Sequence, residues 1–92
     1  MIRKGLIVHG RVQGVGFRFI ASSIAHACKV TGFVRNEFNG TVSIEVQGAD
    51  HRVNSFVDQI REGNRFARVD YIDIRDLPLV PADKETQFRV KY

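Results

Sequence analysis

The chain contains 92 residues, of which 43% are hydrophobic and 26% are charged, and its formal net charge is +4. A chain of this length has room for one hydrophobic core, and this composition is typical of a globular protein rather than a disordered one. No apolar run is long enough to cross a membrane, and glycine and histidine interrupt the N-terminal segment too early for a secretory signal. We therefore expect one domain, residues 1–92, in the cytoplasm and without a membrane partner. The positive charge indicates an anionic partner.

The first two predicted elements flank a glycine-rich segment. Residues 2–9 predict a strand, which ends where the segment GRVQGVGFR begins at Gly10. Over residues 17–29 the apolar side chains recur three and four positions apart, which predicts an amphipathic helix with one buried stripe. Cys28, the only cysteine, belongs to this stripe and is expected to be a small buried packing residue. The glycine-rich loop therefore leads directly into the N-terminus of a helix.

The middle of the chain predicts a hairpin followed by a second helix. Residues 32–36 form a short apolar segment, residues 37–40 a turn, and residues 41–47 alternate strictly, so the hairpin has one wet face. Asp50 is expected to be the N-cap of the second helix, and Gly63 ends that helix. This helix has one apolar face and is predicted only to pack.

The last third of the chain predicts two more strands. Residues 67–77 change the phase of their alternation part-way, which indicates a bulge or a twist. Pro78 and Pro81 mark a loop, and residues 87–92 form a short final strand. The order is strand, helix, strand, strand, helix, strand, with a short strand added. This order predicts the α+β ferredoxin-like split βαβ sandwich, in which one antiparallel sheet carries two helices on one face.

The segment GRVQGVGFR has the features of an anion-binding loop. It lacks the Gly-Lys-Ser or Gly-Lys-Thr ending of a P-loop, and Phe19 stands where a dinucleotide fingerprint needs a third glycine or alanine. What remains is a strand, glycines that let backbone N–H groups converge, and a helix start that carries Arg18. Together these features favour a phosphate or phosphoryl group. The residues alone leave a second interpretation equally open, in which the glycines only permit a tight turn.

Three segments closely resemble the acylphosphatase family. GRVQGVGFR at residues 10–18 is similar to the first signature of that family, and GFVRNEFNGTVSIEVQG at residues 32–48 is similar to the second. QFRVKY at residues 87–92 resembles the family's C-terminal strand. The two signatures have the expected order and spacing, and no functional position departs from the family pattern. The resemblance covers essentially the whole chain.

This resemblance implies an enzyme that hydrolyses the carboxyl–phosphate bond of an acyl phosphate to carboxylate and inorganic phosphate, without a metal or other cofactor. It implies that Arg18 binds the phosphoryl group and that Asn36 positions the attacking water. The matching loop residues would surround the phosphoryl group with backbone N–H groups: Arg11, Val12, Gln13, Gly14, Val15, Gly16 and Phe17. The expected partners are the substrate and inorganic phosphate, as product and inhibitor, and the protein is expected to be a monomer.

The chemistry of these residue types agrees with that reaction. A guanidinium presents paired donors to two phosphoryl oxygens. Phosphoryl transfer depends mainly on positioning and charge stabilisation, so an amide that orients water can replace a strong base. The conjugate acid of the leaving carboxylate has a pKa of about 4 to 5, so no general acid is needed. Five other polar residues are expected to be structural or solvated: His9, His26, His51, Glu37 and Asp50.

The same residues also allow other interpretations. Taken alone, Asn36 is better explained as a turn residue, and the resemblance reverses that preference. A nucleic-acid-binding module is an alternative, because the same sandwich carries RNA-recognition domains and the chain is basic with seven phenylalanines. However, GFVRNEFNG lacks the RNP1 signature, and residues 41–47 present Thr, Ser, Glu and Gln on their open face, so no nucleic acid partner is expected. A non-catalytic regulatory domain is the other alternative, against which intact Arg18 and Asn36 argue.

Overall fold

The helices and strands follow the predicted order. In the computed structural model, which describes residues 1–92, the elements are β1 (Ile2–Arg11), α1 (Phe17–Cys28), β2 (Thr31–Asn36), β3 (Val42–Gly48), α2 (Asp50–Glu62), β4 (Arg68–Leu77) and β5 (Phe88–Lys91). The strands lie in the order β4-β1-β3-β2-β5, and the expected ferredoxin-like α+β fold is confirmed. The sheet is mixed rather than wholly antiparallel, because β5 runs parallel to β2 at one edge.

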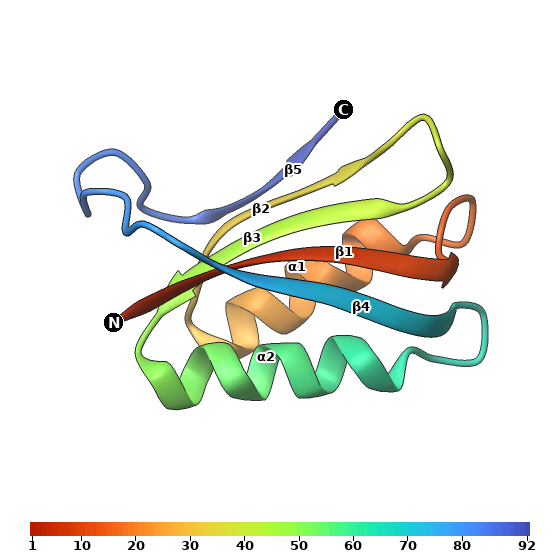
Figure 1. Ribbon diagram of the computed structural model, residues 1–92, viewed down its shortest axis with the longest axis horizontal. Helices are drawn as coiled ribbons and strands as arrows, with labels where there is room; N and C mark the ends of the chain where they lie inside the picture. The colour runs from red at the N-terminus through yellow and green to blue at the C-terminus, as the bar shows by residue number, and fades with distance from the viewer.

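Both helices cover the same face of the sheet (Figure 1). α1 lies over β2 and β5, and α2 lies over β1, β3 and β4. The alternation predicted for residues 41–47 is confirmed, since Val42, Ile44 and Val46 are fully buried beneath the helices. Burying such a side chain contributes about 1.5 to 3 kcal/mol. Because one core joins all these elements, the C-terminal ends of β1 and β2 and the start of α1 have fixed relative positions.

Three local details refine the predictions. The register of β1 against β4 shifts between His9, which pairs with Tyr71, and Gly10, which pairs with Val69. This shift confirms the bulge predicted within residues 67–77. The N-cap of α2 is Ala49, whose backbone is extended, so Asp50 is not the cap and lies instead in the first helical turn. Cys28 is only partly buried, because it ends α1 beside α2, where its Sγ accepts a hydrogen bond from Gln59 at 3.3 Å. Neither helix is long and apolar enough to span a membrane.

A charged network on the open face of the sheet was not predicted from the sequence. The side chain of Arg3 on β1 is only 3% exposed. Its guanidinium donates to both carboxylate oxygens of Glu85 at 2.8 and 3.0 Å, and also to Glu45 at 3.1 Å and to Gln47 at 3.2 Å. Glu85 belongs to residues 78–87, which connect β4 at one edge of the sheet to β5 at the other. We call this connection the strap.

The network anchors the strap to the sheet. Gln47 donates to the carbonyl of Val80 and accepts from its N–H, both at 2.8 Å. The hydrogen bond to Glu85 raises the pKa of Arg3 above its usual value, against the opposing effect of burial. Burial alone would raise the pKa of Glu85, but the hydrogen bond and the charge of Arg3 outweigh it, so this pKa lies below its ordinary value. The strap therefore delivers the chain into β5 along a fixed course.

Candidate active site

Two glycines shape the loop between β1 and α1. Gly14 and Gly16 have φ angles of 73° and 75°, in the left-handed region that favours glycine. A Cβ atom at either position would meet no other atom within 4 Å, so the backbone conformation, and not a lack of space, requires glycine here. The loop can therefore turn sharply from the strand into the helix.

This turn leaves a group of backbone N–H donors without acceptors. The N–H groups of residues 13–19 donate to no backbone carbonyl, and the first hydrogen bond of α1 runs from the N–H of Ile20 to the carbonyl of Gly16 at 3.1 Å. Gly16 is the N-cap of α1 and supplies no capping side chain, and the first turn contains no acidic residue. Free N–H groups and the positive end of the helix dipole favour an anion at this position.

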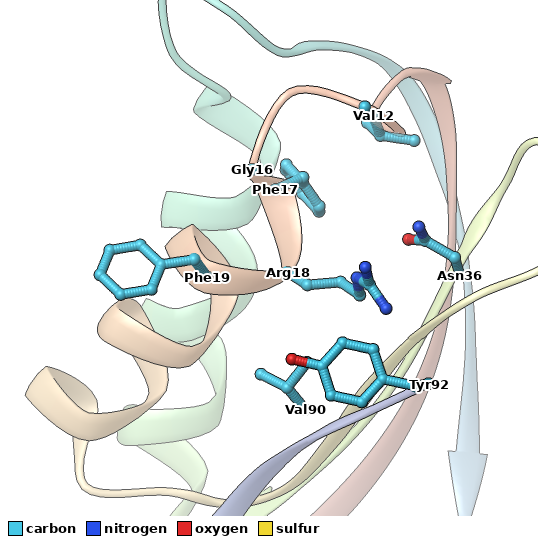
Figure 2. A pocket seen from close by; sticks show the side chains of 9 residues that line it. Val12, Gly16, Phe17, Arg18, Phe19, Asn36, Val90 and Tyr92 are labelled. Carbon is cyan, nitrogen blue, oxygen red and sulfur yellow. The ribbon is translucent and has the colours of Figure 1, made fainter.

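The loop, α1 and the ends of β2 and β5 surround a cavity of about 260 Å³ (Figure 2). Its lining combines backbone donors with polar and apolar side chains: Val12, Gly14, Gly16, Phe17, Arg18, Phe19, Asn36, Val90 and Tyr92. The structure thus brings both predicted catalytic residues, Arg18 and Asn36, to one cavity with four of the other predicted loop residues. Arg11, Gln13 and Val15 do not line it.

Arg18 projects from the first turn of α1 into this cavity (Figure 2). One guanidinium nitrogen, Nη1, donates to the carbonyl of Lys91 at 3.3 Å, and the guanidinium carbon lies 4.7 Å from the centre of the Tyr92 ring. Arg18 takes part in none of the ion pairs of the protein. Most of its N–H donors therefore remain available to a ligand, in the planar geometry that matches two oxygens of an oxyanion.

Asn36 is the last residue of β2 and faces the cavity from the side opposite the helix (Figure 2). Its side-chain oxygen, Oδ1, is buried and accepts no hydrogen bond from the protein. A buried polar atom without a partner costs about 1 to 3 kcal/mol, so it calls for an explanation in each case. An oxygen at this position can accept a hydrogen bond from a water molecule in the cavity.

The chain matches one known family over nearly its whole length. The sequence model of the acylphosphatase family matches residues 4–90, and an acylphosphatase of Clostridium beijerinckii is 49% identical over 92 residues, with all of both chains covered. The chain belongs to the acylphosphatase family. The crystal structure of the acylphosphatase from Bacillus subtilis is 33% identical and has a TM-score of 0.92, again with all of both chains covered.

A second solved acylphosphatase, from Coxiella burnetii, has a TM-score of 0.89 and 26% identity over 98% of this chain and 92% of its own. Membership of the acylphosphatase family and these structural relatives favour acyl phosphate hydrolysis over the nucleic-acid-binding and regulatory alternatives. The protein is an acylphosphatase enzyme that hydrolyses acyl phosphates to carboxylate and inorganic phosphate.

The side chain of Gln13 has a structural role in this acylphosphatase. Its Nε2 donates to the carbonyls of Glu37 at 2.7 Å and Thr41 at 2.8 Å. Both acceptors flank the turn that follows Asn36, so Gln13 ties the loop to the end of β2. The carboxylate of Glu37 accepts hydrogen bonds from Arg35 and Ser43 within the hairpin, as expected for a structural residue.

Phe19, Val90 and Tyr92 also line the cavity and were not predicted from the sequence as site residues. Phe19 follows Arg18 in α1, whereas Val90 and Tyr92 arrive from the last strand and its end. The only available signal was the resemblance of QFRVKY to the C-terminal strand of acylphosphatases, which carried no functional assignment. The proximity of Val90 and Tyr92 to Arg18 depends on the parallel pairing of β5 with β2.

Proposed function

We propose that the cavity is the active site and that each lining group has a defined role in acyl phosphate hydrolysis. The phosphoryl group binds between Arg18 and the backbone N–H groups of the loop, and Asn36 holds the attacking water. The observation that carries this proposal is the combination, in one cavity, of an arginine without an ion pair and a buried amide oxygen without a partner.

The cationic side of the cavity stabilises the charge of the phosphoryl oxygens. Arg18 donates in a plane to two of them, and the N–H groups at the start of α1 donate to the others. Because the transition state is loose and its charge is spread over these oxygens, preformed donors stabilise it without reorganisation. The loop glycines and the shared core hold these donors in place.

The amide of Asn36 orients the nucleophile. Its Oδ1 accepts a hydrogen bond from the water, whose oxygen forms the new bond to phosphorus as the bond from phosphorus to the acyl oxygen breaks. The carboxylate leaves with the electron pair of that bond, and the water gives its proton to the phosphate product or to solvent. The leaving group is a weak base, so it needs no acid catalyst.

The reaction is proposed to need no metal ion or cofactor. Arg18 and the loop donors supply the charge stabilisation that a metal would otherwise provide. Inorganic phosphate, as the product, is proposed to bind the same donors and to inhibit competitively. We also propose that the protein acts as a monomer in the cytoplasm. We propose no nucleic-acid partner, because GFVRNEFNG lacks the RNP1 signature.

Hydrolysis of benzoyl phosphate by the purified protein tests this proposal. We expect turnover that is unchanged by EDTA and competitively inhibited by inorganic phosphate. Loss of turnover in EDTA with recovery on adding Mg²⁺ or Zn²⁺ would contradict the metal-independent mechanism. A salt-controlled RNA titration in the same preparation should show no specific binding.

A further inference from the structure

Gln13 joins the loop that follows β1 to the turn that follows β2. These two segments lie at the same end of the sheet (Figure 1). The pairing of β1 with β3 stops before either segment, so no backbone ladder connects residues 12–16 to residues 37–41. The two hydrogen bonds from Nε2 of Gln13 to the carbonyls of Glu37 and Thr41 are the only hydrogen bonds between the segments, and no ion pair joins them.

Neither carbonyl would be left without a donor if Gln13 were removed. The carbonyl of Glu37 also accepts from the N–H of Gly40 at 3.3 Å, and the carbonyl of Thr41 accepts from the N–H of Glu37 at 2.9 Å. The side chain of Asn39 closes the same turn through its hydrogen bonds with Thr41. Because the turn is closed by its own groups, the amide of Gln13 supplies no partner that the turn lacks. Its two hydrogen bonds instead fix where the turn lies relative to the loop.

The two acceptors of Gln13 lie on either side of Asn36. Glu37 directly follows Asn36 in the chain. Thr41 precedes Val42, which pairs with Asn36 across the hairpin. No group of the protein donates to Oδ1 of Asn36, so no hydrogen bond of its own fixes this oxygen. Its position therefore depends on the backbone at the end of β2, which Gln13 holds.

The backbone of Gln13 belongs to the loop that carries the donors proposed for the phosphoryl group. Its N–H is among those of residues 13–19, which donate to no backbone carbonyl, and the loop continues to Gly16, the N-cap of α1. One residue thus connects these donors with the amide proposed to hold the water. In-line attack requires the water and the phosphoryl group to keep a fixed relative position, so the connection bears directly on the reaction.

We propose that Gln13 is a positioning residue for hydrolysis, which holds the water site at Asn36 in register with the loop that binds the phosphoryl group. This inference rests on the proposed function, because it takes the roles of Asn36 and the loop from there. Gln13 does not line the cavity, so it acts through Asn36 rather than on the reacting atoms. Its effect belongs in kcat, which depends on alignment, and not in the binding of phosphate by Arg18 and the loop.

Gln13→Met tests this role, because it removes both donated hydrogen bonds and keeps a side chain of similar length. We expect kcat for benzoyl phosphate to fall by a factor of about 10 to 100, since a misplacement of about 1 Å can cost about a hundredfold. The inhibition constant of phosphate should stay within about twofold of its wild-type value. Gln59→Met is the matched control. It makes the same change on α2, outside the cavity lining, where Nε2 of Gln59 donates to Ser55 at 3.2 Å, and it should keep the wild-type kcat.

A double-mutant cycle with Asn36→Ala separates positioning from a general structural role. If Gln13 acts through Asn36, adding Gln13→Met to Asn36→Ala should lower kcat by no more than about twofold further. A general loosening of the fold would instead lower kcat by the same factor in both backgrounds. Gln13→Ala, which removes the same donors with a smaller side chain, gives the same comparison if methionine is not accommodated.

The outcomes also separate this inference from the proposed function. A wild-type kcat in Gln13→Met, an equal loss of kcat in both backgrounds, a loss of phosphate affinity in proportion to kcat, or failure of both Gln13 variants to fold would each overturn the positioning role. The proposed function fails on different results. These are wild-type turnover in Asn36→Ala, or no hydrolysis of benzoyl phosphate by the unaltered protein.

Discussion

Arg18 is the residue on which binding of the phosphoryl group is expected to depend most. Arg18→Lys keeps the positive charge but loses the planar pair of donors. We expect kcat to fall by a factor of about a hundred to a thousand, as for removal of one transition-state donor, and inhibition by inorganic phosphate to weaken. Steady-state kinetics with benzoyl phosphate measures both effects. Arg61→Lys, at an exposed position of α2, is the control and should be indistinguishable from wild type.

Asn36 offers a test that separates chemistry from binding. Because its Oδ1 has no partner in the protein, Asn36→Ala breaks no internal hydrogen bond of that oxygen. We expect kcat to fall strongly while the inhibition constant of phosphate and the melting temperature stay near their wild-type values, as for an interaction made mainly in the transition state. Calorimetry, phosphate titration and kinetics on this variant measure the three quantities.

The matched control for Asn36 is Asn39 in the turn that follows. The side chain of Asn39 accepts hydrogen bonds from the N–H of Thr41 at 3.1 Å and from its hydroxyl at 2.6 Å, so Asn39→Ala should lower the melting temperature. If Asn36→Ala instead behaves like Asn39→Ala and also loses phosphate affinity in proportion, then Asn36 is a turn residue and does not position the water.

At the scale of single residues, the residues that the sequence predicted for the site are those that lie within local signatures. Arg18 and Asn36 lie within recognisable signatures, and the structure brings both to the cavity. Gln13 was expected only as part of the loop backbone, because its two carbonyl acceptors lie beyond Asn36 in the hairpin. Tyr92 was not assigned to the site, because its contact with Arg18 joins opposite ends of the chain.

At the scale of the elements, side-chain periodicity predicted every helix and strand with shifts of one or two residues at their ends. Asp50 shows why the ends of helices are harder to predict than their centres. An aspartate is a good N-cap residue but is equally suited to the first turn of a helix, where Asp50 lies. The parallel direction of β5 was not predicted. The direction of β5 follows from the course of the strap, which depends on the buried contacts between Arg3 and Glu85. These contacts could not be predicted, because an arginine in a strand does not indicate which distant carboxylate it pairs with.

The strap should contribute stability that depends on Glu85. Glu85→Gln removes the charge that pairs with the buried guanidinium of Arg3, and we expect the free energy of unfolding at pH 7 to fall by about 2 kcal/mol. Denaturant titration measures this difference. Glu62→Gln, at the exposed end of α2, is the matched control and should change stability little. An unchanged stability of Glu85→Gln would mean that the network does not hold the strap.

The same pair predicts a pH dependence. The pKa of Glu85 is lower in the folded protein than its ordinary value of about 4.3. The stabilisation is therefore fully present above that ordinary value and is lost as the pH falls through the lowered, folded pKa. The difference in stability between wild type and Glu85→Gln should be constant from neutral pH to about pH 5 and should shrink in more acidic solution. A difference that persists undiminished at the acid end would contradict this assignment.

At the scale of the whole molecule, ligand binding and folding should be coupled. The donors of the site belong to a loop and a helix end that exist only in the folded chain, so phosphate should bind the folded state alone. At ten times its dissociation constant it should add about 1.4 kcal/mol to stability, which corresponds to about 6 to 11 °C in melting temperature. Differential scanning calorimetry in phosphate, against chloride of matched ionic strength, measures the shift. Arg18→Lys should reduce it, and an equal shift in both proteins would place the phosphate elsewhere.

At the start of α1, a residue that would stabilise the helix would also interfere with binding of the phosphoryl group. α2 carries Asp50 in its first turn, whereas α1 has neither a capping side chain nor an acidic residue there. An aspartate or serine introduced to cap α1 would accept the same N–H groups that the phosphoryl oxygens need, and a carboxylate would also repel the substrate. The usual route to a more stable helix would therefore act here as a built-in competitive inhibitor, and selection for turnover would keep this helix end uncapped.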